Sequence, residues 1–322
     1  MNPTHCNLCR SSQTANHLSA TDYISTENFH SLRCLQCGLI YVDPQPPATE
    51  LHRYYPTSHQ IAEPAVYEKM DAKPRIKLIA NLENVSETKK ILDIGTGKAL
   101  LLLGLQDQGW DVYGTELSEV SRQYAIKQGL SVFNSTIEEA PLEVESLDVA
   151  TLFHSLEHLT DPKASIEEIK QLLRPGGRVV IEVPNINSWY ARLFKGQWFH
   201  YDAPRHLYHF TPQTLRRLIE DAGLQVENIT THANLPYDAF GAVQSLLNTF
   251  LSNKNLLNNI NTGQTTFREL RKGREPFRNL AALATSQLCL SIGFPLFAIA
   301  NLLTPWIEGG TLRIIAQKPP SQ

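Results

Sequence analysis

The sequence predicts an α/β fold built on a mostly parallel sheet, with a cysteine-bearing head before the sheet and a helical insertion before its last strand. Apolar runs alternate with helical patterns from Ile91 to about His232, which is typical of a sheet covered by helices on both faces. Two CxxC pairs stand near the start of the chain. A last apolar run, TLRIIAQK at 311–318, follows only after a long intervening segment.

Residues 1–47 are predicted to form the head, which ends at the proline-rich DPQPP. Each CxxC can bring two thiolates to one tetrahedral zinc ion. Because the sequence starts without an apolar leader, we expect a cytoplasmic protein in which metal is favoured over disulfides. The expectation is a structural zinc site that folds the head; an unmetallated thiol pair or a redox site is the alternative. Its ligands would be Cys6, Cys9, Cys34 and Cys37.

A mainly helical lead-in is expected at 48–90. The core follows and comprises 91–232 and 311–318, with an insertion at 233–310 between its two parts. DPKASIEEIKQLL indicates an amphipathic helix with RPGG as its stop signal. Thr211 should cap the next helix, with Pro212 in its first turn and Gly223 at its end. The predicted strands are 90–94, 111–115, 130–133, 147–153, 177–183, 224–231 and 311–318.

The run ILDIGTG at 91–97 predicts a bare backbone loop between a strand and a helix. Gly95 and Gly97 can adopt positive φ and let a ligand approach the backbone closely. The third glycine of a pyrophosphate-binding GxGxxG loop is absent, since position 100 is leucine. Glu116 ends the next predicted strand and can accept both hydroxyls of a ribose. The pattern favours a nucleoside cofactor without a pyrophosphate over a plain tight turn beside a solvated acid.

The chain resembles the class I S-adenosylmethionine-dependent methyltransferases in four ordered blocks: ILDIGTG, Glu116, SLDVATLFHSLEHLTDP at 146–162 and LLRPGGRVVIEVPN at 172–185. This resemblance implies a Rossmann-like seven-stranded sheet with S-adenosylmethionine as cofactor. It places the loop at the methionine end, Glu116 on the ribose, and Leu117 and Ile137 on the two adenine faces. Thr136 departs from the acid that relatives often carry there. The implied cofactor residues are Asp93, Gly95, Thr96, Gly97, Glu116, Leu117, Ile137, Phe153 and His154.

FHSLEH at 153–158 follows an apolar strand, at the sheet edge where such folds bind ligands. Methyl transfer to oxygen or nitrogen can need a general base, for which histidine is suited. The stretch is similar to the ubiquinone-biosynthesis type of O-methyltransferase, in which the LEH element faces the methyl-transfer centre. We therefore expect His158 to be the base and Glu157 to position substrate or cofactor. The alternatives are a packing role for His158 or an HxxEH zinc-protease motif, which would need a long helix and a third ligand.

Residues 185–210 follow the fifth predicted strand and are rich in aromatic and histidine side chains. Such a segment suits a lid or an acceptor pocket, although its aromatics could instead pack on the sheet. We expect His206 to be functional. The other side chains that deserve testing are Trp198, His200, Arg205 and His209.

The insertion is apolar near its end: no charged residue stands between Arg278 and Glu308, and an arginine-rich stretch lies just upstream. Segment 268–306 could therefore contact an anionic membrane surface, or form a buried helical pair or a homodimer interface. A spanning helix is not expected, because 311–318 must rejoin the sheet.

The formal net charge of −3 gives no reason to expect a nucleic-acid partner. The sequence thus predicts a cytoplasmic S-adenosylmethionine-dependent methyltransferase, peripheral to the membrane if the insertion contacts it. Its acceptor would be a small molecule, a sugar or a lipid-linked compound, with O-methylation favoured. The alternatives are a sugar C-methyltransferase and a cofactor-binding scaffold without turnover.

Overall fold

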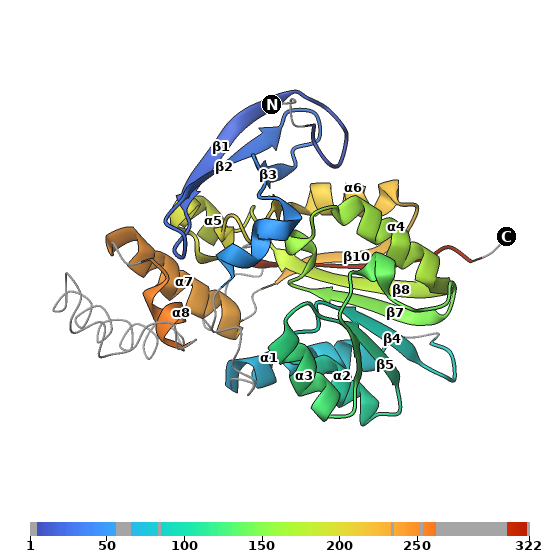
Figure 1. The fold of residues 1–322 in the computed structure, drawn as a ribbon. Helices are drawn as coiled ribbons and strands as arrows, with labels where there is room; N and C mark the ends of the chain where they lie inside the picture. The colour runs from blue at the N-terminus through green and yellow to red at the C-terminus, as the bar shows by residue number, and fades with distance from the viewer. Residues whose placement is uncertain are drawn as a thin grey trace.

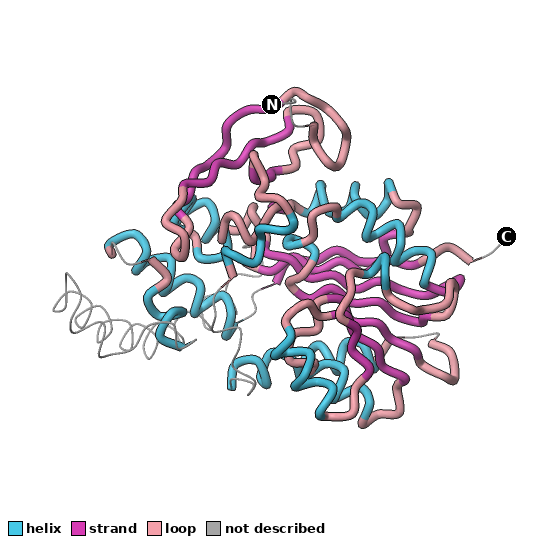
Figure 2. The backbone as a smooth tube through the Cα atoms, viewed as in Figure 1, coloured by secondary structure: helices cyan, strands magenta, loops and turns pink. Residues whose placement is uncertain are grey.

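The computed structural model describes residues 5–55, 66–82, 85–232, 235–251, 254–261 and 308–320. A central sheet is covered by helices above and below it. A smaller sheet, which includes the strands of the head, stands beside these layers (Figure 1). Figure 2 shows the same arrangement by element type, with the magenta strands as the middle layer between cyan helices. The predicted membrane-contacting segment 268–306 lies outside the described residues.

The central sheet has seven strands in the order β10-β11-β8-β7-β4-β5-β6. The five strands from β8 to β6 pair in parallel, whereas β11 runs antiparallel to both of its neighbours. This is the Rossmann-like sheet that the sequence predicts, so the expected fold class is confirmed. The strands are β4 Lys90–Ile94, β5 Asp111–Thr115, β6 Ser131–Phe133, β7 Leu147–Phe153, β8 Leu173–Pro184, β10 Gln225–His232 and β11 Thr311–Gln317.

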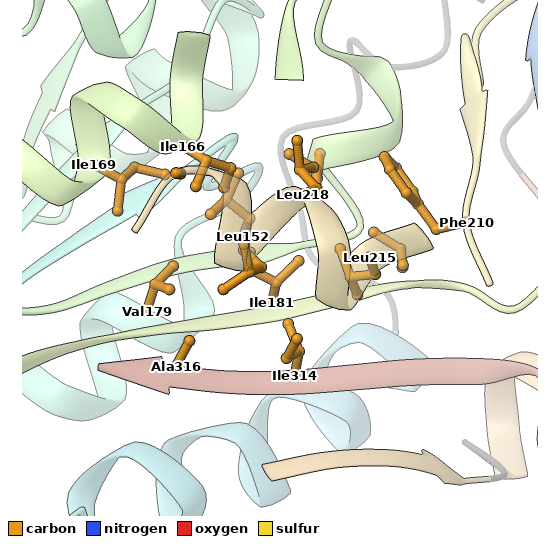
Figure 3. Packing of buried hydrophobic residues seen from close by; sticks show 14 of the residues in the cluster. Leu152, Ile166, Ile169, Val179, Ile181, Phe210, Leu215, Leu218, Ile314 and Ala316 are labelled. Carbon is orange, nitrogen blue, oxygen red and sulfur yellow. The ribbon is translucent and has the colours of Figure 1, made fainter. Parts of the chain in front are cut away.

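Two apolar clusters cover the two faces of this sheet, because successive strand residues point to opposite sides. On one face Leu152 and Ile181 pack with Ile166 of α4 and Leu218 of α6 (Figure 3). On the other face Ile91 and its neighbours pack under α1 and α2. The helices are α1 Val66–Ala80, α2 Leu100–Gln106, α3 Glu119–Lys127, α4 Pro162–Leu172, α5 Trp189–Phe194, α6 Pro212–Asp221, α7 Leu235–Phe250 and α8 Leu256–Asn261.

Most element boundaries agree with the sequence-based expectations. Thr211 caps α6 through a capping box, Pro212 opens that helix, and Gly223 follows it with a φ of 80°. The fifth predicted strand differs, because β8 begins at Leu173 and includes the RPGG stretch. The register with β7 shifts between Leu147 and Val149, and the backbone of Lys318 bonds to both glycines of RPGG, at 2.8 and 3.0 Å. Because of these long-range contacts, the RPGG stretch follows the end of α4 directly as the first part of β8.

The head is joined to the core by backbone pairing. Its strands β1 Thr14–Thr21, β2 Asn28–Cys34 and β3 Ile40–Val42 form a sheet with β9 Tyr208–His209, which belongs to the segment after β8. Cys6 and Cys34 are fully buried in the same apolar cluster as Tyr208 and other residues of the core. Among the described helices, none is long and apolar enough to cross a membrane.

Candidate active site

The glycine loop follows β4 at the carboxyl edge of the sheet. Gly95 and Gly97 adopt positive φ values of 71° and 54°, as the sequence predicts. A Cβ atom on Gly95 would stand 2.8 Å from Cβ of Ser155, which leaves no space for a side chain there. A Cβ on Gly97 would have no neighbour within 4 Å, so the backbone is open on that side. Ala99 also has a positive φ, 55°, and no sequence signal indicated it.

Glu116 lies directly beside this loop. Its Oε2 accepts a hydrogen bond from the backbone N–H of Gly97 at 2.7 Å, and its Oε1 accepts one from Ser118 at 2.7 Å. Burial raises the pKa of this carboxyl group, and the backbone donors oppose that shift. Because a carboxylate oxygen can accept more than one hydrogen bond, both oxygens keep a lone pair for a ribose hydroxyl.

Asp93, the next candidate for cofactor binding, is buried near the end of β4. Its Oδ1 accepts a hydrogen bond from Oγ1 of Thr151 at 2.6 Å. Burial raises the pKa of Asp93 to about 7, although this hydrogen bond opposes the shift. The structure therefore holds a carboxyl group whose charge is costly unless a cation comes near it.

Three apolar side chains that the sequence assigned to the cofactor have different surroundings. Leu117 is 69% exposed, so a flat ligand could cover it. Ile137 is buried in the main core cluster. Phe153 lies under the guanidinium of Arg75, 4.6 Å from the ring centre to Cζ. Arg75 comes from α1, pairs with Glu182 at 2.8 Å, and carries no motif by which the sequence could have revealed it.

Glu157 is the centre of the predicted acceptor side. The side chain is 1% exposed, and neither of its oxygens has a hydrogen-bond partner among the described residues. Burial by itself would raise the pKa of Glu157, but His154, His206 and His158 lower it to about 2. The cluster could also hold a metal ion, because one possible ligand atom from each residue lies within 4.8 Å of those of the others in the set Glu157, His158 and His206.

His158 is held in a defined orientation. Its Nδ1 lies 3.0 Å from the carbonyl oxygen of Arg205 and 3.1 Å from the hydroxyl of Tyr55. A carbonyl oxygen only accepts, so Nδ1 carries the proton and Nε2 keeps the lone pair that can act as a base. Burial and the nearby His206 lower the pKa of His158 to about 4, which keeps the ring neutral at physiological pH. Tyr55 was not singled out from the sequence.

The segment after β8 contributes fewer site residues than its composition suggested. His206 joins the cluster, with Nδ1 2.8 Å from the carbonyl oxygen of His200 and its ring centre 4.7 Å from that of His158. His200 stacks on Tyr237 of α7 at 4.1 Å, and Tyr237 also lies 4.6 Å from His154. The remaining candidates pack elsewhere: Trp198 in the core, His209 against Tyr201, and Arg205 in buried ion pairs.

The four cysteines of the head lie together as predicted. Sγ of Cys6 is 3.5 Å from that of Cys37, Sγ of Cys9 is 3.5 Å from that of Cys34, and all four sulfurs are within 4.8 Å of one another. Zinc–sulfur bonds of ~2.3 Å in a tetrahedron place the sulfurs roughly 3.8 Å apart. No disulfide joins these cysteines. The donor set therefore fits a zinc ion.

Comparisons with known proteins show the family to which the chain is similar. A family model described as a methyltransferase domain matches residues 67–229, about half of the chain. The chain is 30% identical over 166 residues to a ubiquinone biosynthesis O-methyltransferase of Pectobacterium atrosepticum, which covers 47% of this chain and 69% of the relative. The corresponding protein of Aeromonas salmonicida is 33% identical over 155 residues, or 44% of this chain and 65% of the relative. Among solved structures, the [4+2]-cyclase SpnF is similar in fold, with a TM-score of 0.50 and 15% identity over 80% of this chain and 84% of that chain.

Proposed function

This chain belongs to the methyltransferase-domain family and is an S-adenosylmethionine-dependent methyltransferase, and on that premise we propose how it holds its cofactor and which acceptor it methylates. The cofactor supplies an electrophilic methyl group when it is bound. Glu116 would hold the ribose hydroxyls, since its carboxylate is fixed by two backbone donors beside the open loop. Asp93 would face the positively charged methionine end, because burial still raises the pKa of its carboxyl group although Thr151 and the charge of Arg75 oppose that shift, and a further positive charge would favour the carboxylate.

The adenine would lie on the exposed side chain of Leu117, with Ile137 behind it. Thr96, Phe153 and His154 complete the set of residues assigned to the cofactor. Arg75 joins this proposal from α1, because its guanidinium stands on the Phe153 ring at the same edge of the sheet. The nitrogens of Arg75 already pair with Asp71 and Glu182, at 2.6 and 2.8 Å, so Arg75 would hold the Phe153 ring in place and would not bind a carboxylate of the ligand.

We propose that the acceptor is a small molecule methylated on a hydroxyl group, as in a sugar, a lipid-linked glycan or a quinone-like compound. The observation that carries this proposal is the buried carboxylate of Glu157 among three histidines, with Nδ1 of His154 at 3.6 Å and Nε2 of His206 at 4.0 Å from its Oε1. Nε2 of His158 would take the hydroxyl proton, and the charge of Glu157 would stabilise the imidazolium that forms. His206, whose ring centre lies 4.7 Å from that of His158, would orient the hydroxyl. The similarity to ubiquinone biosynthesis O-methyltransferases favours the same chemistry.

The head would contribute to this function through its fold. We propose that Cys6, Cys9, Cys34 and Cys37 hold a structural zinc ion. Four thiolates leave no open coordination position, so the metal would fix the head and take no part in the methyl transfer.

The proposal is tested by incubating the purified protein and methyl-labelled cofactor with a cell lysate that has been split into lipid and soluble fractions. We expect label in a low-molecular-weight product of one fraction. His158→Ala should keep cofactor affinity and lower the rate by about 10²–10⁴-fold. His30→Ala, an exposed histidine of the head, serves as the matched control and should turn over normally. Equal turnover by both variants would show that the base is misassigned.

A further inference from the structure

Arg205 is a buried cation that joins the head to the segment after β8. Its side chain is 3% exposed, and Nη1 bonds to Oδ1 of Asp22 at 2.8 Å. The other nitrogens bond to both oxygens of Asp202, at 2.6 and 2.9 Å. Its guanidinium lies 4.4 Å from the ring centre of Tyr23 and donates to the carbonyl oxygen of Tyr54. Asp22 and Tyr23 belong to the turn between β1 and β2, so one guanidinium fixes the head to the core.

The backbone of the same residue holds the candidate base. The carbonyl oxygen of Arg205 accepts the Nδ1 proton of His158 at 3.0 Å. The second group beside Nδ1 is the hydroxyl of Tyr55, which directly follows Tyr54 in the chain. Both groups that face Nδ1 are therefore held by one side chain, through its own backbone and through the Tyr54 carbonyl.

This connection matters because a neutral imidazole exists as two tautomers, and only the form protonated at Nδ1 leaves Nε2 free to accept a proton. A carbonyl oxygen at a fixed place selects that form. If the carbonyl moved, the ring would lose a hydrogen bond worth about 1 kcal/mol, and the preference between tautomers would fall by several-fold.

We propose that Arg205 is a positioning residue that couples the cysteine-bearing head to the acceptor side: Asp22 and Asp202 fix its guanidinium, and its carbonyl sets the tautomer of His158. This inference rests on the proposed role of His158 as the base. It gives the head a function beyond stability, because loss of the Asp22 contact would alter a catalytic nitrogen in another part of the chain. Asp22 is then required for Nε2 of His158 to stay unprotonated and able to accept a proton.

The test uses ¹⁵N-histidine NMR of the full chain with zinc bound, which reports the tautomer of each ring without needing an acceptor. The His158 signals are identified by their loss in His158→Gln. In the wild type we expect the form protonated at Nδ1. Asp22→Asn keeps the shape of the side chain but removes its charge. It should lower the ratio of the Nδ1-protonated form to the Nε2-protonated form of His158 by about five- to tenfold. The affinity for S-adenosylhomocysteine should stay unchanged in the same variant.

Asp148→Asn is the matched control, because it removes another buried carboxylate that pairs with an arginine, Arg174, outside the site. It should lower stability without altering the His158 signals. If Asp22→Asn lowers stability similarly and leaves the tautomer ratio at the wild-type value, Arg205 is only a structural clamp and the proposal is wrong. Where Asp22→Asn fails to fold, Asp22→Ser replaces it; this variant also removes the charge, so an unchanged ratio there also contradicts the proposal. If no methyl transfer is found, the proposed function is wrong. The NMR measurement would still test the role of Arg205, because it needs no acceptor.

Discussion

The buried carboxyl group of Asp93 makes a quantitative prediction about stability in the absence of cofactor. Its pKa is about 7 in the folded protein, against an ordinary value of 3.8. Because the folded pKa is the higher one, the group favours folding most below pH 3.8, and this contribution is lost as the pH rises through 7. Asp93→Asn places an uncharged side chain of the same shape in the site and removes this dependence.

The magnitude follows from the two pKa values. Burial of the charged form costs about 1.5 kcal/mol at pH 5 and about 4 kcal/mol at pH 8, by linkage between protonation and folding. The stability of Asp93→Asn relative to the wild type should therefore increase by about 2.5 kcal/mol between these pH values. For a protein of this size that corresponds to a relative rise in Tm of about 4 °C.

The assay is urea unfolding of both proteins, without cofactor, at pH 5 and pH 8. Asp111→Asn, at an exposed position on the neighbouring strand β5, is the control and should show no such pH dependence. The same Asp93→Asn variant should bind S-adenosylmethionine more weakly, because it lacks the charge that faces the cofactor. If the stability difference between wild type and Asp93→Asn is the same at both pH values, the carboxyl group is not held in the protonated form, and our account of the site is wrong.

Four further predictions concern Glu116, the two glycines of the cofactor loop and the head. Glu116→Gln should weaken cofactor binding by about 100-fold in calorimetric titration, since two charge-assisted hydrogen bonds to the ribose would be lost; unchanged affinity would contradict its role. Gly95→Ala should destabilise the fold by roughly 2 kcal/mol or more, because its Cβ would stand 2.8 Å from Cβ of Ser155 at a φ of 71°. Gly97→Ala, which has free space at its Cβ, should cost only about 1 kcal/mol in the same denaturant assay. Cys34→Ser should release zinc in native mass spectrometry and lower the Tm; full retention of the metal would exclude the four-cysteine site.

Much of the fold could be predicted because its signals are local. The apolar runs and the helix caps, such as Thr211 with Pro212, lie in neighbouring residues and need no tertiary information. The glycine loop and Glu116 could be placed together because their spacing is set by one strand–helix–strand unit. The four cysteines were found for the same reason, as two short motifs.

The remaining site residues depend on contacts between distant segments. Tyr55 and Tyr237 reach the histidine cluster from the lead-in and from α7, with no motif to mark them. The pairing of β3 with β9, which brings the head to the segment after β8, joins strands more than 160 residues apart. Arg205 was a candidate for the acceptor pocket, and only the structure shows that its side chain is used in ion pairs with Asp22 and Asp202.

The most direct test of the central claim measures cofactor turnover and product together. The protein is incubated with methyl-labelled S-adenosylmethionine and fractionated lysate, and both S-adenosylhomocysteine and labelled small molecules are quantified. We predict equal amounts of the two products, both formed about 10²–10⁴-fold more slowly by His158→Ala while this variant still binds the cofactor. Tight cofactor binding without either product, in every fraction, would contradict the assignment of an acceptor site to Glu157, His158 and His206.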